Sequence, residues 1–310
     1  MDENRTPIIL VLLSTYNGER YLKEQLDSLL TQEGVKVHIL VRDDGSTDGT
    51  RMILTTYREK YPAIFSLIYG ENMGWQRSFF ELMIVAKEGF LPYDYYAFCD
   101  QDDIWLPRKL LRAVEQINIL RTDIRLYCSN LYYYKDNINH GLIKTEGYLP
   151  TPENCLIRNF ATGCTIIFNQ ELLDVVVMRL PQREIPHDKW VYQVAVLLGS
   201  VYVDKKAYIM YRQHMGNQIG CKRNRKEIWS QRLKTLRSTT NQHVRELEAR
   251  ELINCFSDML PLHCLKAVHK VAYYRNNLSS RLSLVFDRRY STGLCSNDFW
   301  LRLRILVGKL

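Results

Sequence analysis

Short apolar runs alternate with helical patterns through the first hundred residues, and this alternation limits what the chain can fold into. The runs at 8–13, 35–41, 65–69 and 95–99 are apolar and partly β-branched. Strands buried on both faces of a parallel sheet have this composition. Helical patterns follow the first three runs, the second of them with Asp48 as a candidate cap. Such an alternation predicts a doubly wound α/β sheet.

Polar clusters follow three of these predicted strands. They occupy residues 14–17, 43–50 and 100–103. In doubly wound sheets, ligands bind at the carboxyl ends of the strands, near the point where the strand order reverses. The three clusters are therefore expected to meet at one ligand-binding edge of the sheet.

Beyond residue 107 the pattern becomes less regular. We expect a helix after Pro107, strands at 125–134 and 164–168, helices at 170–178 and 187–198, and strand-like runs at 201–203 and 207–211. Residues 135–160 look like a loop, and from about residue 220 basic helical patterns replace the strands. At roughly 150 residues per domain, 310 residues allow two units. The predicted boundary separates residues 1–220 from a helical region at 221–310.

The strongest chemical signal is the acidic cluster Asp100-Gln101-Asp102-Asp103, directly after an apolar strand. Three carboxylates in four residues repel one another unless a cation holds them. Mg²⁺ commonly binds one or two carboxylates together with substrate phosphates. The alternative is a solvated acidic turn that caps the following helix. The position at a strand end favours a site.

The second cluster, DDGSTDG at 43–49, superficially resembles a calcium loop. An EF-hand needs a glutamate at its twelfth position, which is Thr55 when counted from Asp44. Carboxylates at a strand end can instead accept hydrogen bonds from a nucleobase or a ribose. Helix capping by Asp48 and turn formation by the glycines also account for part of the pattern. The chain has neither GxGxxG nor GxxxxGK[ST], so a phosphate site in this sheet would need a metal.

Two further groups of residues are candidates for catalysis or ligand binding. Asp188 follows His187 at the start of an apolar helix, where an aspartate is either a cap or a general base. Arg212 and His214 lie where a strand gives way to a polar loop. Arg212 is a candidate phosphate contact and His214 a candidate metal ligand, although a lone histidine more often has a core or surface role.

Charge is distributed unevenly along the chain. The sequence has 42 Lys and Arg against 34 Asp and Glu, a net charge of +8. Residues 221–310 hold 18 basic and 7 acidic residues, a net of +11, so residues 1–220 have a net of −3. A basic tail of this kind faces nucleic acid, an anionic membrane surface or solvent.

Cysteine usage and hydropathy indicate the compartment. The eight cysteines form no CxxC pair, which argues against a zinc ribbon or a disulfide scaffold and suits a reducing environment. The N-terminus lacks the basic region of a signal peptide, and no run approaches the ~18 apolar residues of a membrane span. We therefore expect a cytoplasmic protein that can touch a membrane without crossing it.

Three segments together resemble a known family. LVLLSTYNGERYLKEQLDSLLTQ, VRDDGSTDGT and FCDQDDIWLPRKL are similar to the motifs of family-two glycosyltransferases with the GT-A fold. The resemblance covers roughly residues 7–220. The segments NFATGCTIIFNQEL, HDKW and YRQH resemble the branch that includes bacterial rhamnosyltransferases of surface-polysaccharide assembly. The resemblance to this family implies a GT-A doubly wound mixed sheet with a nucleotide-sugar half at 1–105 and an acceptor half at 106–220.

The resemblance also implies a role for each candidate residue. The nucleotide pocket would be formed by Thr15, Tyr16, Asn17, Asp43, Asp44 and Asp100. Asp100 and Asp102 match the metal-binding DXD motif, and His214 matches a later metal or diphosphate contact, so the cofactor would be Mg²⁺ or Mn²⁺. Asp188 matches the general base. Contacts to the acceptor or diphosphate are expected from Gly163, Cys164, Arg212 and Asp103.

The implied reaction is an inverting transfer of one sugar from dTDP-rhamnose or a UDP-hexose. The acceptor would be a hydroxyl of a glycan or of an undecaprenyl-diphosphate-linked oligosaccharide. Many relatives have a glutamate where this chain has His187, so the acceptor preference does not carry over. The QxxRW motif of processive synthases is missing, which favours single addition.

Two other classes of function stay open at this stage. One is a nucleic-acid-binding protein that uses the basic tail, although no nucleic-acid-binding motif is present. The other is a catalytically silent nucleotide-sugar scaffold, against which the retained carboxylates argue. The transferase reading instead places the enzyme on the inner face of the cell membrane, with the tail on an anionic surface or folded as a helical cap.

Overall fold

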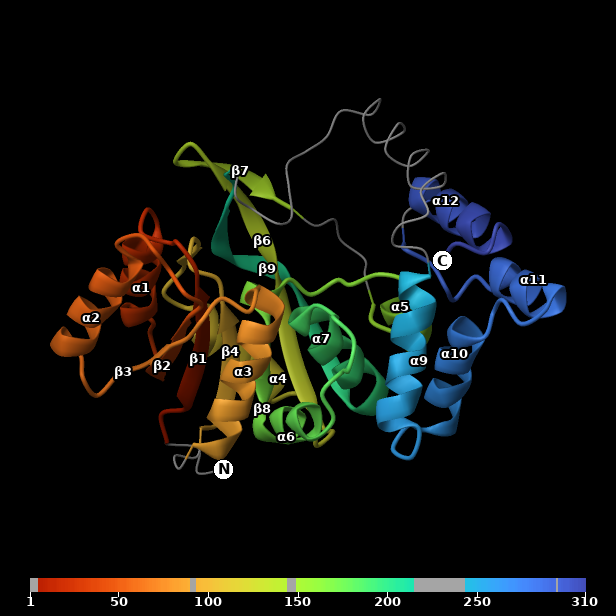
Figure 1. Cartoon of the computed structure of the whole chain (residues 1–310), viewed down its shortest axis with the longest axis horizontal. Helices are drawn as coiled ribbons and strands as arrows, with labels where there is room; N and C mark the ends of the chain where they lie inside the picture. The colour runs from red at the N-terminus through yellow and green to blue at the C-terminus, as the bar shows by residue number, and fades with distance from the viewer. Residues whose placement is uncertain (1–4, 90–92, 144–148, 215–242, 294) are drawn as a thin grey trace.

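The four apolar runs of the first hundred residues form parallel strands, as the sequence predicts. The structure, a computed structural model, describes residues 5–89, 93–143, 149–214, 243–293 and 295–310 (Figure 1). The four strands are β1 (Ile8–Thr15), β2 (Lys36–Asp43), β3 (Phe65–Tyr69) and β4 (Tyr95–Cys99). The helices that connect them are α1 (Leu22–Leu30), α2 (Thr50–Lys60) and α3 (Trp75–Glu88).

The strand order places a switch point beside β1. The order among described residues is β3-β2-β1-β4-β8-β6-β9-β5, with β7 paired to β6. The chain runs outward from β1 to β2 and β3, and then returns to place β4 on the other side of β1. The carboxyl ends of β1 and β4 therefore lie side by side at this switch point, where doubly wound sheets bind ligands. Residues 14–17 and 100–103 lie at this switch point.

The second half of the sheet mixes strand directions, as the family resemblance implies. β8 runs antiparallel to β4 and β6, whereas β6 and β9 are parallel. The strands of this half are β5 (Ile104–Trp105), β6 (Arg125–Lys135), β7 (Ile138–Leu142), β8 (Ile167–Asn169) and β9 (Ser200–Arg212). Its helices are α4 (Lys109–Ile117), α5 (Pro152–Cys155), α6 (Gln170–Met178) and α7 (His187–Leu198).

The sheet separates two cores, and alternate residues of β1 belong to each. Leu10 and Leu12 pack in the core that contains α3, α6 and α7. Val11 and Leu13 pack on the opposite face, in the core that contains α1, α2 and α4. Because successive side chains of a strand point to opposite faces, an unbroken apolar run is what a doubly covered strand requires.

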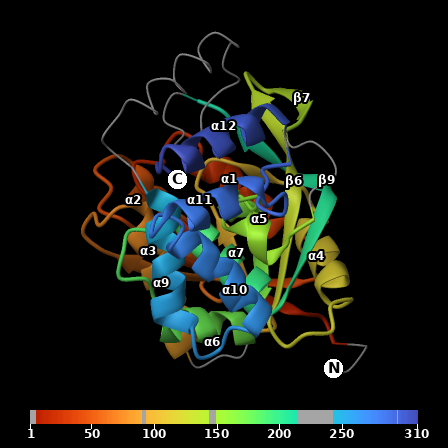
Figure 2. The same ribbon diagram turned by 90° about the vertical axis from the view of Figure 1, so that its right-hand side faces the viewer.

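The described part of the C-terminal region contains four helices, and α9 shares the first core. They are α9 (Val244–Phe256), α10 (Leu262–Ala272), α11 (Leu278–Phe286) and α12 (Cys295–Leu306). Phe256 of α9 packs on Trp190 of α7, with 5.7 Å between ring centroids. The four helices lie at the end of the molecule opposite α1 and α2 (Figures 1 and 2). The predicted boundary at residue 220 lies outside the described residues.

Both acidic and basic residues of this region form ion pairs. Lys189 of α7 binds Glu248 of α9, and Arg179 binds Asp258. Within the region, Arg250 and Arg275 both pair with the buried Glu246. The tail is therefore joined to the rest of the protein by charge as well as by apolar packing.

Several predicted elements are wrong in detail. Residues 164–168 do not form one strand, because a 3₁₀ turn at Gly163–Thr165 precedes β8. The supposed loop at 135–160 contains β7 and α5. The two runs near 201–211 form the single strand β9, whose register with β6 shifts opposite Ser129 and Asn130. A polar stretch, Asp204 to Lys206, splits the apolar pattern of this strand.

No helix in the described part of the chain is both long enough and apolar enough to span a bilayer.

Candidate functional site

The three polar clusters meet at one edge of the sheet, and hydrogen bonds tie their loops together. The Asn17 Oδ1 atom accepts from the Thr47 N–H at 2.8 Å, and the Asn17 N–H donates to Ser46 Oγ at 2.9 Å. Gln101 bonds both backbone groups of Tyr16, at 2.8 and 3.0 Å. Residues far apart in sequence are thus brought into one site, as strand-end positions predict.

Asp43 and Asp44 are buried and fully engaged within the protein. The Asp43 carboxylate accepts from Thr15 Oγ1 at 3.3 Å, from the Ser46 N–H at 3.1 Å and from Arg51 Nε at 2.7 Å. The Asp44 carboxylate pairs with Arg42 and accepts from the backbone N–H groups of residues 73 and 74 at 3.0 and 2.9 Å. Both aspartates fix the loops around the pocket, and their contact with a base or a ribose stays a prediction.

Arg42 is a functional-site residue that the sequence analysis missed. Its guanidinium is buried and also donates to the Glu71 carbonyl at 3.1 Å. The available signal is a charged residue inside an apolar strand, where an unpaired charge would be costly. A buried arginine therefore implies a buried acid nearby.

We expect Arg42→Met to lower the free energy of unfolding by about 3–5 kcal/mol, because it leaves Asp44 buried without its counter-ion. Urea denaturation followed by circular dichroism measures this loss. The matched control is Arg77→Met, which breaks the exposed pair with Glu184 and should change stability by about 0.5 kcal/mol or less. Equal losses in the two variants would contradict the proposed role of Arg42.

The acidic cluster follows β4 directly, and its carboxylates are crowded. Asp103 is fully buried; its Oδ1 accepts from the Arg212 N–H at 3.1 Å, and its Oδ2 has no hydrogen-bond partner among the described residues. Burial, together with repulsion from Asp102 and Asp188, raises the pKa of Asp100 to about 7. Burial and the neighbouring Asp102 and Asp100 also raise the pKa of Asp103 well above its usual range. A bound cation would relieve this repulsion.

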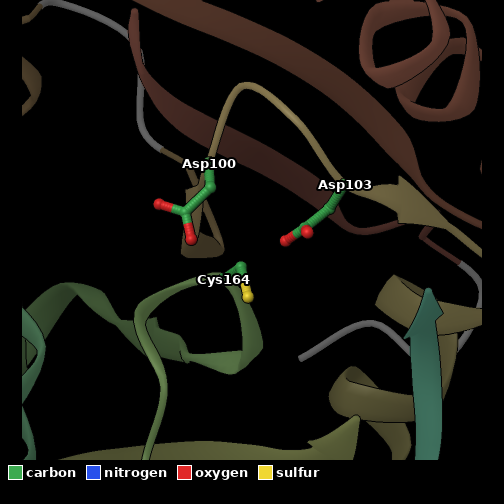
Figure 3. A group of neighbouring side chains, drawn as sticks. All are labelled: Asp100, Asp103 and Cys164. Carbon is green, nitrogen blue, oxygen red and sulfur yellow. The ribbon is translucent and has the colours of Figure 1, made fainter. Parts of the chain in front are cut away.

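The donor atoms near this cluster fit a hard divalent cation. Oxygen atoms of Asp100 and Asp103 and the sulfur of Cys164 lie within 4.8 Å of one another, and the three side chains converge in Figure 3. Burial raises the pKa of the Cys164 thiol well above its usual range, so the thiol stays protonated and is a poor ligand. On the outer side, Oδ2 of Asp102 lies 2.7 Å from Nε2 of His214. Carboxylates and one imidazole suit Mg²⁺ or Mn²⁺.

Arg212 and Asp103 lie behind the acidic loop. A cavity lies in front of this loop, and neither residue is among the described residues that line it. The Arg212 guanidinium pairs with Glu24, donates to the Asp102 carbonyl at 2.9 Å and lies 4.6 Å from the centre of the Tyr21 ring. Both residues hold the end of β9 against the loop. Their expected contact with the acceptor or diphosphate stays a prediction.

A cavity of about 720 Å³ opens in front of these loops. Its lining residues include three of the predicted site residues, Asp100, Asp102 and Asp188, together with Gly163 of the 3₁₀ turn. Ser14, Tyr16, Asp44 and Gln101 also line it. Cys164 lies buried beneath Gly163 and is absent from the described lining. The volume is in the range of pockets that enclose small-molecule ligands.

Asp188 is held at the start of α7, where it faces this cavity. Its Oδ2 accepts from Asn159 Nδ2 at 3.2 Å, and its Oδ1 accepts from the Lys189 N–H at 2.7 Å. The N-terminus of a helix stabilises a carboxylate through the helix dipole. Asn159 was not singled out by the sequence analysis, since its contact with Asp188 spans 29 residues. A carboxylate held in this way can accept a proton from a ligand in the cavity.

Comparison with known proteins identifies the family of the chain. The profile of the family described as glycosyl transferase family 2 matches residues 10–176, more than half of the chain. The chain is 30% identical over 217 residues to the dTDP-rhamnosyl transferase RfbG of Shigella flexneri, covering 67% of this chain and 73% of that protein. It is 26% identical to an uncharacterised glycosyltransferase of Rickettsia typhi, covering 74% and 73% respectively.

Solved structures share the fold. The S. aureus TarS fragment 1–349 in complex with UDP-GlcNAc has a TM-score of 0.57 at 18% identity, covering 96% of this chain and 81% of that one. The mannosyltransferase PcManGT of Pyrobaculum calidifontis, in complex with GDP-Man and Mn²⁺, has a TM-score of 0.52 at 15% identity, covering 99% and 77%. The expected GT-A fold is confirmed. The chain belongs to glycosyl transferase family 2 and is a glycosyltransferase.

Proposed function

We propose that the enzyme transfers one rhamnose from dTDP-rhamnose, with inversion, to a hydroxyl of a lipid-linked glycan. The observation that carries the proposal is that Asp188 lines one cavity together with Asp100 and Asp102 of the acidic cluster. The similarity to a dTDP-rhamnosyl transferase supports the choice of donor over a UDP-hexose.

In the proposed reaction, Asp188 accepts the proton of the acceptor hydroxyl. The acceptor oxygen forms a bond to the anomeric carbon as the bond from that carbon to the diphosphate oxygen breaks, and the diphosphate leaves with the electron pair. Attack from the face opposite the leaving group inverts the anomeric centre. Asn159 and the N-terminus of α7 orient the Asp188 carboxylate for this step.

The carboxylates of the acidic cluster serve the leaving group. Asp100, Asp102 and His214 would hold a Mg²⁺ or Mn²⁺ ion, with Asp103 behind them. When bound, such an ion neutralises negative charge on the diphosphate. The site favours a cation, because burial and then repulsion from Asp102 and Asp188 raise the pKa of Asp100, and a positive charge would offset both effects.

A donor screen tests this function. The purified protein is incubated with dTDP-rhamnose, UDP-glucose or UDP-galactose, Mn²⁺ and an undecaprenyl-diphosphate-linked oligosaccharide, and the products are analysed by mass spectrometry. We expect one deoxyhexose to be added, and only from dTDP-rhamnose. Transfer of a hexose would overturn the proposed donor, and a lack of transfer to lipid-linked acceptors would overturn the proposed acceptor.

We further propose that the enzyme works at the inner face of the cell membrane, with α12 on the bilayer surface. One face of this helix is buried and includes Trp300, Leu301 and Ile305. Its exposed face carries Phe299 at 63% exposure, Leu306 at 43% and, just beyond the helix, Val307 at 50%. The spacing of seven and eight residues places them on one side. Apolar side chains on a helix in a basic region fit an anionic surface.

The double substitution Phe299→Ser and Leu306→Ser should reduce binding to anionic lipid vesicles about tenfold, because two apolar side chains no longer enter the interface. Co-sedimentation with vesicles of phosphatidylcholine and phosphatidylglycerol measures this. Point variants are preferable to truncation, since α9 shares its core with α7. Ile119→Ser, at an exposed position of 57%, is the control. Unchanged sedimentation of the double variant would exclude α12 as the contact.

A further inference from the structure

Two unlike groups of side chains line the cavity, and the reaction proposed above uses only one of them. Asp100, Asp102 and Asp188 are the carboxylate group. Trp75 and Phe79 from the start of α3 and His187 from α7 also line the cavity. These three residues are called the aromatic wall below. Nothing in the chemistry of proton transfer or of diphosphate departure accounts for it.

His187 is built into this wall as an uncharged ring. It is 3% exposed, and its ring stacks on Phe79 with 3.9 Å between centroids and 22° between planes. Phe98 meets the same ring edge-on at 4.7 Å. Burial lowers the pKa of His187 to about 3, so the imidazole is neutral at neutral pH. Neither ring nitrogen has a hydrogen-bond partner among the described residues, which indicates that the ring is held by its faces.

Gly163 lets this ring approach the reaction centre. A Cβ atom at residue 163 would lie 3.0 Å from Nε2 of His187 and 3.7 Å from the Cβ of Asp188. A side chain at this position would therefore crowd the His187 ring, whereas it would meet Asp188 at an ordinary van der Waals distance. The missing side chain allows the imidazole to pack directly beside the proposed base.

Trp75 extends the wall to the cavity mouth. Its ring meets His187 edge-on, with 5.6 Å between centroids, and 38% of the residue is exposed. The preceding Gly74 has a φ of 84°, in the left-handed region, and its N–H donates to Asp44 at 2.9 Å. The tryptophan is thus fixed between the loop that carries Asp44 and the helix that carries Asp188.

A sugar ring is the ligand that suits such a wall. One face of a hexose or deoxyhexose presents several C–H groups, which pack on the face or edge of an aromatic ring while its hydroxyls remain free for polar partners. Asp188 and Asn159 stand within the same cavity to receive those hydroxyls. We propose that the partly exposed Trp75, which the buried His187 ring holds in place, forms a stacking surface for a sugar ring at the reaction centre, an inference that rests on the proposed transfer of a sugar.

Two sugars meet at this centre, the one that is transferred and the one that accepts it, and kinetics can tell which of them stacks. We expect Trp75→Ala to raise the KM for one sugar substrate about tenfold. A rise in the KM for the nucleotide sugar assigns the wall to the donor, and a rise in the KM for the acceptor assigns it to the acceptor. Trp75→Phe should restore most of the loss, because it keeps a ring at this position.

Three controls separate stacking from general damage. His187→Phe keeps the ring without the two unpartnered nitrogens, so it should change either KM less than threefold and raise the melting temperature. Affinity for dTDP alone should be unchanged in Trp75→Ala, since the free nucleotide carries no sugar. Phe286→Ala removes an exposed aromatic ring outside the cavity and should have no kinetic effect.

The outcomes also distinguish this inference from the function on which it rests. If the unaltered enzyme transfers no sugar from any donor, the proposed function fails. If it transfers sugar and Trp75→Ala leaves both KM values within twofold, the stacking surface is refuted while the function stands. Equal losses in Trp75→Ala and Trp75→Phe, with both proteins folded, would also refute stacking.

Discussion

Asp188→Asn is expected to lower kcat for sugar transfer by about 10²- to 10⁴-fold, the range associated with a general base. The substitution preserves the size of the side chain and a carbonyl oxygen that can still accept from Asn159 Nδ2. It removes the one property that the mechanism needs, the capacity to take a proton at neutral pH. Donor binding should survive, since the lining residues predicted to contact the nucleotide, Tyr16 and Asp44 among them, are different from Asp188. Steady-state transfer rates and titration calorimetry with the donor measure the two effects separately.

The matched control is Glu184→Gln, which neutralises an exposed carboxylate outside the cavity and should leave kcat unchanged. Transfer by the Asp188→Asn variant within tenfold of the unaltered enzyme would remove Asp188 from the role of base. A parallel loss of donor affinity would instead show that Asp188 belongs to the donor site. The two failures are distinguishable because one appears in kcat and the other in calorimetry.

The parallel half of the fold follows from the sequence for a clear physical reason. β1, β2 and β4 are covered on both faces, so they need consecutive apolar residues, and such runs stand out from the helical patterns between them. The second half carries weaker signals. β7 is exposed along its whole length and β5 has only two residues, so neither leaves an apolar pattern to detect.

In the candidate site, too, some residues can be predicted from the sequence and others cannot. Asp100, Asp102 and Asp188 are predictable because each lies at the end of a strand or the start of a helix, where the fold presents side chains to a ligand. The partners that hold site residues in place are less visible. Asn159 reaches Asp188 across 29 residues, and Trp75 meets His187 only after α3 and α7 have packed. Such pairings depend on tertiary structure, which no local pattern encodes.

The basic tail shows how composition can mislead when it is taken alone. Its net charge of +11 suggested an open binding surface, yet Arg250 and Arg275 are committed to the buried Glu246. Charge counts do not show which groups are paired inside the fold. The narrower proposal, that the exposed apolar face of α12 contacts a membrane, depends on burial at individual positions.

Asp102→Ala is expected to abolish the effect of Mn²⁺ on donor affinity. Removing a residue that only holds a metal ligand in place typically costs about 10- to 100-fold in metal affinity, and losing a direct ligand should cost at least as much. Titration calorimetry with dTDP-rhamnose, with and without Mn²⁺, measures this difference. Glu184→Ala serves as the control, because its carboxylate is exposed and outside the cavity. A full response to Mn²⁺ in the Asp102→Ala variant would exclude Asp102 as a ligand.

The same substitution should make the metal-free protein more stable at neutral pH. Burial and then repulsion from Asp102 and Asp188 raise the pKa of Asp100 to about 7, so between its unfolded pKa of about 3.9 and 7 the folded state binds the extra proton. The stability that this proton contributes is present at low pH and is lost as the pH rises through 7. Removing Asp102 takes away part of the cause, so thermal denaturation in chelator should show a gain that is larger at pH 8 than at pH 5. Lower stability at both pH values, together with a loss of activity, would indicate that the substitution damages the loop. Weaker metal-dependent donor binding in a more stable protein would instead identify carboxylate repulsion that a cation relieves.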